Sequence, residues 1–156
     1  MSDSTVPTAK PASWMNALMR GMLKTPGVQR FLGRAIALLT VTGRRSGRPI
    51  TLPISYERDG DSVVLVTKRA RVWWRNLEAN PVVRLRLAGK EHTGTASLAV
   101  GDPAALPVFV DFLRDRKVDA RAYGIPMGPD GEPDPERTAE VLPELVVIRV
   151  ALDGSR

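Results

Sequence analysis

Hydrophobic and polar residues alternate most clearly in the middle of the chain. In VRLRL, residues 83–87, three apolar residues alternate with two arginines, which is the period of a strand with one packed and one wet face. The segment AGK (residues 88–90) then supplies a turn, and residues 92–100 return with small and polar side chains. This pattern predicts an antiparallel hairpin.

Other short β-type runs lie on both sides of this hairpin. Before it come residues 38–42, 50–56 and 62–67, separated by the turn-forming segments 43–49 and 58–61. After it, residues 145–150 supply a last strand. The short separations favour local antiparallel pairing.

Helical spacing of apolar residues appears at four places. Residues 14–23 carry an amphipathic stripe, and Thr25-Pro26 can cap and begin a second helix that runs to residue 36. Residues 73–79 predict a short helix, which ends at Asn80-Pro81 because the residue before a proline disfavours helical geometry. Asp102-Pro103 begins a fourth helix.

Residues 117–143 are expected to be long and irregular, because five prolines and three glycines interrupt them. Loops of this length are usually functional lids or disordered inserts, and the sequence leaves both readings open. The order of elements predicts an α+β chain that is mainly β, an antiparallel split β-barrel with flanking helices.

The 156 residues suit one compact domain, which we expect to span residues 13–156 after a flexible tail of residues 1–12. We find no apolar run long enough to cross a bilayer and no secretory leader, and we therefore expect a cytoplasmic protein. Cysteine is absent and His92 is the one histidine. Disulfides, thiolate metal sites and cysteine nucleophiles are excluded, and a histidine zinc site is disfavoured.

A formal charge of +6 predicts attraction to an anion. The strongest candidate site is the connection GRRSGR, residues 43–48, where backbone N–H groups and arginine side chains can surround an anion. The alternative is a solvated hairpin turn with exposed arginines. Nucleic acid is not the expected anion, because aromatic residues make up only 5% of the chain and offer few stacking platforms.

A second basic cluster, Lys68, Arg69, Arg71 and Arg75, surrounds Trp73 and Trp74. Positive charge beside flat apolar faces would suit an aromatic ring system with anionic groups. The alternative is that Trp73 packs a short helix onto the barrel while the arginines are solvated. Asn76 stands out as a polar residue on a largely apolar helix.

No side chain in the sequence has the surroundings of an activated nucleophile or a general base. Ser46 lies outside any nucleophile-elbow motif, and neither a Walker nor a G-x-G-x-x-G motif is present. If the chain is an enzyme, a cofactor must carry the chemistry.

The segments LLTVTGRRSGRPITLPISY, VVLVTK and VWWRNLEANPVVRLRL together resemble the deazaflavin-dependent nitroreductase family, in the split β-barrel flavin-binding superfamily. The paired signature, G-R-x-S-G-x followed by W-x-x-N-L-x-A-N-P, carries the resemblance, which spans residues 35–96. It implies coenzyme F-420 as the cofactor, with FMN as the second choice. The residues that it places near the cofactor are Arg44, Arg45, Ser46, Gly47, Arg48, Pro53, Ile54, Thr67, Lys68, Trp73 and Asn76.

The reaction that the resemblance implies is hydride transfer between the reduced deazaflavin and a quinone, nitroaromatic or enone. The connection between Lys68 and Trp73, residues 69–72, is shorter than is common in the family, which shortens one wall of the implied pocket. Tyr123 is the only tyrosine after the hairpin. The identity of the substrate therefore cannot be inferred from the resemblance.

Other possibilities stay open. The same fold can bind FMN or haem or store a cofactor, and a basic nucleic-acid-binding module is a lower alternative. Dimers are common in the superfamily, so a homodimer is a further expectation. The helix of residues 14–23 could also rest on the inner face of a membrane, although packing onto the barrel is the simpler use of its stripe.

Overall fold

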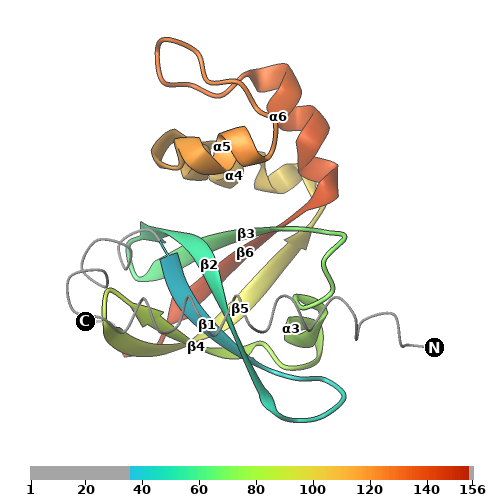
Figure 1. Ribbon diagram of the computed structural model, residues 1–156, viewed down its shortest axis with the longest axis vertical. Coiled ribbons are helices and arrows are strands. Elements are labelled where there is room, and N and C mark those ends of the chain that lie inside the picture. Colours follow the sequence, from blue (N-terminus) through green and yellow to red (C-terminus); the bar gives the residue numbers. More distant parts are fainter. Residues whose placement is uncertain (1–35, 155–156) are drawn as a thin grey trace.

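A computed structural model describes residues 36–154 (Figure 1). The tail of residues 1–12 and the helices predicted for 14–23 and 25–36 lie outside the described residues, apart from Ile36, which begins the first strand. The domain limits at residues 13 and 156 stay a prediction.

Six antiparallel strands form a closed barrel in the order β1-β2-β3-β6-β5-β4, which confirms the predicted fold class. In the chain they are β1 Ile36–Thr42, β2 Pro49–Asp59, β3 Ser62–Lys68, β4 Val82–Leu87, β5 Lys90–Val100 and β6 Leu145–Leu152. All six predicted strands are present. The second is longer than predicted, since β2 continues into the segment 58–61 that was read as a turn.

The barrel interior is filled by the apolar residues that alternate along each strand. Val83, Leu85 and Leu87 of β4 point inward and are at most 4% exposed, as their alternation with arginine predicts. Each joins one cluster with inward residues of the other strands. The arginines between them, Arg84 and Arg86, lie on the outer face.

The long strand β2 changes partner along its length. From Pro49 to Ser55 it pairs with β1, whereas only its last part, from Tyr56 to Asp59, pairs with β3. The first half of β2 and the last residues of β3 therefore separate at one end of the barrel. This is the end at which β1 leads into the GRRSGR connection.

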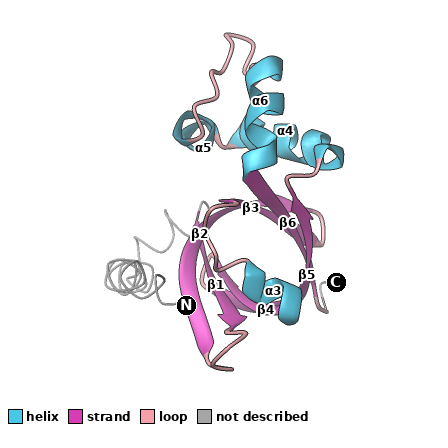
Figure 2. Ribbon diagram, turned by 90° about the vertical axis from the view of Figure 1, so that its right-hand side faces the viewer, coloured by secondary structure: helices cyan, strands magenta, loops and turns pink. Residues whose placement is uncertain are grey.

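The short helix α3, Arg75–Ala79, closes the same end (Figure 2). It buries Leu77 and the preceding Trp74, each 3% exposed, against the interior cluster. The helix predicted for residues 73–79 is confirmed, although its first turn is irregular.

A helical layer, residues 103–144, lies against the outer face of the barrel. It consists of η1 Pro103–Ala105, α4 Leu106–Asp115, α5 Lys117–Ala122, α6 Pro135–Val141 and η2 Leu142–Glu144. Phe109, Phe112 and Leu113 of α4 pack with Val64 and Val66 on the outer face of β3. Figures 1 and 2 both show the layer standing over β3 and β6. The layer thus has a second apolar core outside the barrel.

The prediction that residues 117–143 are irregular is wrong for most of their length. Both α5 and α6 are formed, and Asp134 caps α6 through the Arg137 N–H with Pro135 in the first turn. Between them, Met127 and Pro133 pair as a small hairpin. Packing onto the second core supplies the stability that the short helices lack by themselves.

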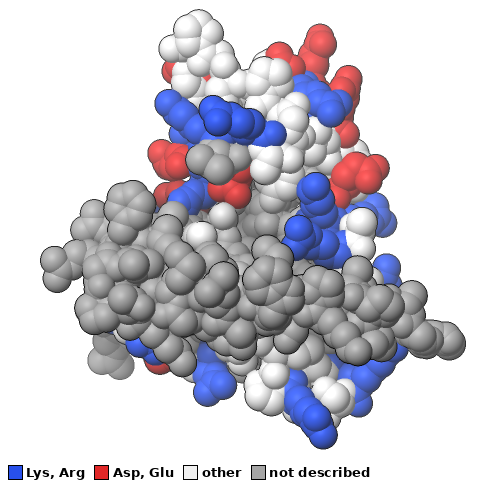
Figure 3. Space-filling view, viewed as in Figure 1, with Lys and Arg blue, Asp and Glu red and all other residues white. Residues whose placement is uncertain are grey.

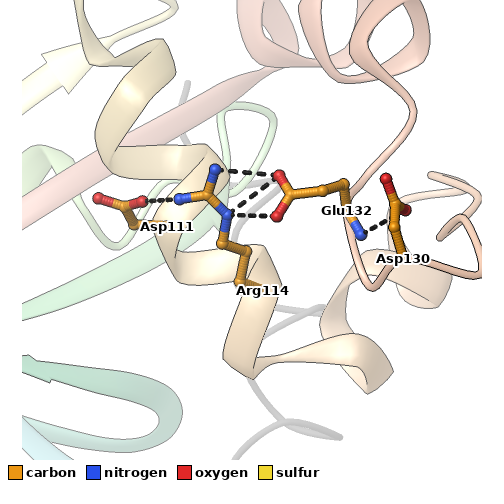
Figure 4. Close-up of polar contacts among 4 residues, drawn as sticks. All are labelled: Asp111, Arg114, Asp130 and Glu132. Carbon is orange, nitrogen blue, oxygen red and sulfur yellow. Dashed lines mark hydrogen bonds and ion pairs between the residues drawn. The ribbon is translucent and has the colours of Figure 1, made fainter.

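One arginine fastens that hairpin to α4 (Figure 4). Arg114 makes a two-pronged contact with Glu132, with N–O distances of 2.9 Å from Nε to Oε1 and from Nη2 to Oε2, and it also contacts Asp111. The Glu132 N–H in turn donates to Asp130 Oδ1 at 3.1 Å. The segment 126–134 is therefore a braced hairpin.

Candidate cofactor site

The GRRSGR connection, called here the arginine turn (residues 43–48), folds into a compact loop. The Gly43 N–H donates to the Arg48 carbonyl and the Gly47 N–H to the Gly43 carbonyl, each at 2.8 Å. Gly47 has a φ of 71°, and a Cβ on Gly43 would lie 2.8 Å from Ser46 Oγ. Both glycines are therefore needed for the shape of the turn.

Asn76 joins the arginine turn to α3. Its Oδ1 accepts the Arg44 N–H at 2.9 Å, and its Nδ2 donates to the Trp73 carbonyl at 2.9 Å. The Arg44 guanidinium also donates to the Val72 carbonyl at 3.4 Å. Asn76 is only 6% exposed, so both ends of its amide are used in a buried place. The two sequence signatures are thus in direct contact.

The cations of the arginine turn have no acidic partner within residues 36–154. Arg44, Arg45 and Arg48 are exposed and form no salt bridge there, and the backbone N–H groups of Arg45 and Ser46 have no hydrogen-bond partner in the same part of the chain. Ser46 Oγ accepts the Arg48 N–H at 3.1 Å, which leaves its hydroxyl proton available to a ligand. These groups form a cradle of donors suited to an anion.

The two tryptophans are fixed by hydrogen bonds as well as by packing. Trp73 Nε1 donates to Thr67 Oγ1 at 3.2 Å, and Trp74 Nε1 donates to the Arg69 carbonyl at 3.1 Å. Arg75 lies over the Trp74 ring, 5.2 Å from its centroid. Trp73 remains half-buried at the edge of the interior cluster. Both tryptophans therefore pack the helix onto the barrel, as the alternative interpretation had it.

The short connection 69–72 is a tight turn that also reaches the helical layer. The Arg71 N–H donates to the Lys68 carbonyl at 3.0 Å, and the Arg69 N–H donates to the Glu144 carbonyl at 2.7 Å. The Arg69 side chain contacts the Pro143 carbonyl at 3.4 Å. This link between the barrel end and the helical layer is not visible in the sequence pattern.

The remaining predicted site residues lie in pairs on opposite faces of their strands. Pro53 pairs with Leu38 on the outer face, whereas Ile54 packs against the interior cluster. Thr67 is 6% exposed with its hydroxyl engaged by Trp73, whereas Lys68 is exposed. Thr67 therefore supports Trp73, whereas the Lys68 side chain lies on the other face of β3, and its contact with a cofactor stays a prediction.

Three groups with raised pKa values lie away from the arginine turn, between β2 or β3 and the helical layer. Burial raises the pKa of Asp119 and of Glu57, and it raises the pKa of Tyr123 to about 12. The Tyr123 hydroxyl donates to the Val66 carbonyl at 3.3 Å and its ring meets Phe109 edge to face. These side chains join the layer to the barrel.

Metal chemistry finds no support in the described part of the chain. No group of three His, Cys, Asp or Glu side chains in residues 36–154 could hold a metal ion. His92 is half-buried near the start of β5, at the end of the barrel opposite α3. In the same residues, no helix is long and apolar enough to cross a membrane.

The described residues form a split β-barrel of six strands, with the arginine turn at the end of β1. Among the solved structures that share this fold is an F420 reductase, with a TM-score of 0.50 and 21% sequence identity over 78% of this chain and 88% of that chain. Another is an FMN-binding protein from Nostoc punctiforme related to pyridoxamine 5'-phosphate oxidase. Its TM-score is 0.57, with 14% identity over 86% of this chain and 78% of that chain. At these identities the likeness concerns the fold alone.

The sequence profile of the F420H(2)-dependent quinone reductase family matches residues 15–123, which is well over half of the chain. The chain belongs to this family of oxidoreductases, whose coenzyme is the reduced deazaflavin F-420. An F420H(2)-dependent quinone reductase of Mycobacterium tuberculosis H37Rv is 36% identical over 64 residues, 38% of this chain. The match spans 43% of that relative, and a reductase of the same name from strain CDC 1551 matches equally.

The cradle fits the anionic part of such a coenzyme. Two exposed guanidinium groups, Arg45 and Arg48, stand beside two unpaired backbone N–H groups and a hydroxyl, and no carboxylate forms a salt bridge to them within the described residues. Phosphate and carboxylate oxygens are the natural partners of this donor set.

Proposed function

We propose that the chain transfers a hydride from reduced F-420 to a quinone, with the anionic tail of the coenzyme held at the arginine turn. The contact between Asn76 and the Arg44 N–H is the observation that carries this proposal, because it joins two signatures 32 residues apart. Family membership supports the choice of coenzyme and of acceptor.

The bound deazaflavin supplies the hydride, and the quinone takes it up with a proton from solvent to become a quinol. The protein binds and orients the two reactants. Arg45, Arg48 and Ser46 hold the anionic tail, Asn76 positions the turn, and Trp73 closes the barrel end against Thr67. Orientation of this kind can supply much of the rate, and no acid–base side chain is required.

The test is a titration of the full chain with F-420, followed by oxidation of reduced F-420 on addition of menadione. In Arg45→Gln/Arg48→Gln we expect affinity for F-420 to fall at least about thirtyfold, because each of the two charge-assisted contacts contributes about 1–2 kcal/mol. Thermal stability should not change, since both side chains are exposed and unpaired.

Arg58→Gln is the matched control. Arg58 is also an exposed arginine beside a turn, and it lies at the opposite end of the barrel. Its affinity for F-420 should stay within twofold of the unmodified protein. Equal losses in the control and in the double variant would show only a general effect of net charge, and tighter binding of FMN or haem than of F-420 would favour the alternative cofactors.

Binding of F-420 without oxidation by any quinone would contradict turnover while leaving the cofactor assignment in place. Nitroaromatics and activated enones are the other acceptors that we propose, and the same assay compares them. A homodimer stays an expectation, which sedimentation of the full chain checks.

A further inference from the structure

The barrel end opposite α3 contains a hollow that has no part in the proposed function. Its volume is about 470 Å³. It lies between the last part of β2 and the β4–β5 hairpin, and its lining includes Tyr56, Glu57, Arg58, Leu87, Lys90 and His92. Strand β1 begins at Ile36 opposite Ser55, so beyond this point no described strand lies between β2 and β4. The hollow is called here the basic mouth, after Arg58, Lys90 and His92.

The register of the strands turns these three basic side chains inward. Arg58 pairs with Val63 of β3, and Lys90 and His92 each pair with a leucine of β4. Val63 and both leucines belong to the interior cluster. Residues directly opposite each other on paired antiparallel strands project to the same face of the sheet. The three bases therefore lie on the inner side of the barrel, just beyond its apolar core.

The acidic residues that alternate with these bases along the strands face outward. Arg149 Nη1 lies 2.6 Å from Asp59 Oδ2, and Arg86 Nη1 lies 3.7 Å from Glu91 Oε2. Glu57 borders the hollow, but its place in the register is on the outer side, toward the helical layer. On the face in Figure 3, carboxylates likewise lie mostly over the helical layer. The neighbouring carboxylates are thus directed away from the basic mouth.

The bases of the basic mouth form no salt bridge among residues 36–154. Arg58 Nε donates to the Gly60 carbonyl at 3.2 Å. The side chains of Lys90 and His92 make neither a salt bridge nor a hydrogen bond in the same part of the chain. Like charges that converge on one hollow repel each other, and an anion between them removes that repulsion. The basic mouth therefore offers a set of donors that an anion would complete.

We propose that the basic mouth binds the phosphate group of a small organic phosphate monoester. A guanidinium, an ammonium and an imidazole can together make several charge-assisted hydrogen bonds to one phosphate. The volume is larger than inorganic phosphate fills and falls in the usual range of small-molecule sites. Tyr56 and Leu87, at 8% and 4% exposed, form an apolar floor for the organic part.

This second anion site goes beyond the proposed function and does not depend on it. The six residues of β4 span roughly 20 Å between the end that carries α3 and the end that carries the basic mouth. The arginine turn lies at the first of these ends. The two groups of cations therefore face different ligands.

The test is a titration of the full chain with phenyl phosphate, followed by NMR. His92 is the only histidine in the chain, so its ring protons report directly on the basic mouth. Phenyl phosphate would also reach the arginine turn, and the Arg45→Gln/Arg48→Gln variant removes that binding from the titration. In this variant and in the unmodified protein, we expect the His92 signals to shift in a single saturable step. Phenol, which lacks the phosphate, should leave them unchanged.

Lys90→Gln should weaken the binding of phenyl phosphate at least about tenfold, because it removes one charge-assisted contact. Arg84→Gln is the matched control, since it removes the same charge from an exposed residue on the outer face of the same hairpin. Its affinity for phenyl phosphate should stay within twofold of the unmodified protein. Equal losses in the two variants would show only an effect of net charge and would overturn the proposal.

Two further results would overturn it. One is binding of phenyl phosphate without any shift of the His92 signals, or loss of that shift in Arg45→Gln/Arg48→Gln, because the anion would then lie at the arginine turn. The other is binding of phenol as tight as that of phenyl phosphate. An unmodified protein that shows the His92 shift but oxidises no reduced F-420 would contradict the quinone assignment and leave the basic mouth standing.

Discussion

Arginine does different work in the helical layer and at the arginine turn. In the layer, Arg114 and Arg137 form salt bridges with Glu132 and Glu140 at 2.9 and 3.0 Å, and Arg116 lies 3.7 Å from Asp119. At the arginine turn, none of the three arginines has a carboxylate partner among the described residues. The two groups are the same residue type in the sequence, but the fold pairs the first group with carboxylates and leaves the second exposed.

The comparison also separates what each region contributes to stability. The helical layer has its own buried aromatic core, while the arginine turn is fixed mainly by Asn76 and a few backbone hydrogen bonds. A change in the layer should therefore alter stability and spare cofactor affinity. A change at the arginine turn should reduce cofactor affinity. A change of Asn76, whose buried side-chain amide holds the turn, should alter stability as well.

The largest expected effect on stability is in the layer, at Phe109. Phe109→Ala empties a site that is 0% exposed and should lower the free energy of unfolding by about 3–5 kcal/mol, measured by urea denaturation. Affinity for F-420, measured below the transition, should change less than twofold. Val110→Ala on the same helix, half-buried and outside the apolar cluster, should cost much less. A large loss of affinity in Phe109→Ala would show that the two regions are coupled.

Asn76→Ala should affect stability and binding together. It leaves the Arg44 N–H without its partner and should cost about 1–3 kcal/mol, with at least tenfold weaker binding of F-420 as the turn loosens. Differential scanning calorimetry and the F-420 titration measure the two effects. Glu78→Ala, exposed on the same helix, should change neither. Stability lost without any loss of affinity would reduce Asn76 to a purely structural role.

Arg114→Gln should loosen the braced hairpin with little global cost. Exposed ion pairs contribute about 0–1 kcal/mol, so the unfolding transition should move only slightly. Residues 126–134 should instead become open to limited proteolysis, since the contact with Glu132 fastens them to α4. Arg121→Gln, an exposed arginine of α5, should leave the digestion pattern unchanged. An unchanged pattern in Arg114→Gln would mean that the hairpin holds its shape unaided.

The smallest effect concerns pH. Burial raises the pKa of Asp119 in the folded state, so folding favours its protonated form. Stability from this group is present at acid pH and is lost as pH rises from the unfolded value of 3.8 through the raised folded value. In urea titrations, the free energy of unfolding of Asp119→Asn, relative to that of the unmodified protein, should therefore be higher at pH 7 than at pH 3.5. The opposite trend would mean that attraction to Arg116 outweighs burial.

Much of the barrel could be predicted because alternation of apolar and polar residues reports directly which face is packed. The alternation in VRLRL predicted β4, and the turn-forming segments between the apolar runs predicted the neighbouring strands. The helices α5 and α6 were missed because their six and seven residues are stable only against the second core. Asp134-Pro135 was a helix-start signal within the segment read as irregular.

The sequence predicted which charged residues form the candidate site, but it did not predict the hydrogen bonds that hold them in place. Asn76 could be singled out because a polar residue on an apolar helix needs a partner, but no local pattern identifies a backbone group 32 residues away. The link from Arg69 to Pro143 and Glu144 depends likewise on how the helical layer docks. Contacts of this kind come from tertiary packing.

The position of β6 has a consequence for how the chain is made. This last strand lies between β3 and β5, although residues 101–144 separate it from β5 in the sequence. During synthesis the arginine turn and α3 leave the ribosome long before residues 145–152, and until then β3 and β5 are open sheet edges. A nascent chain would thus carry its ligand cradle before its barrel can close.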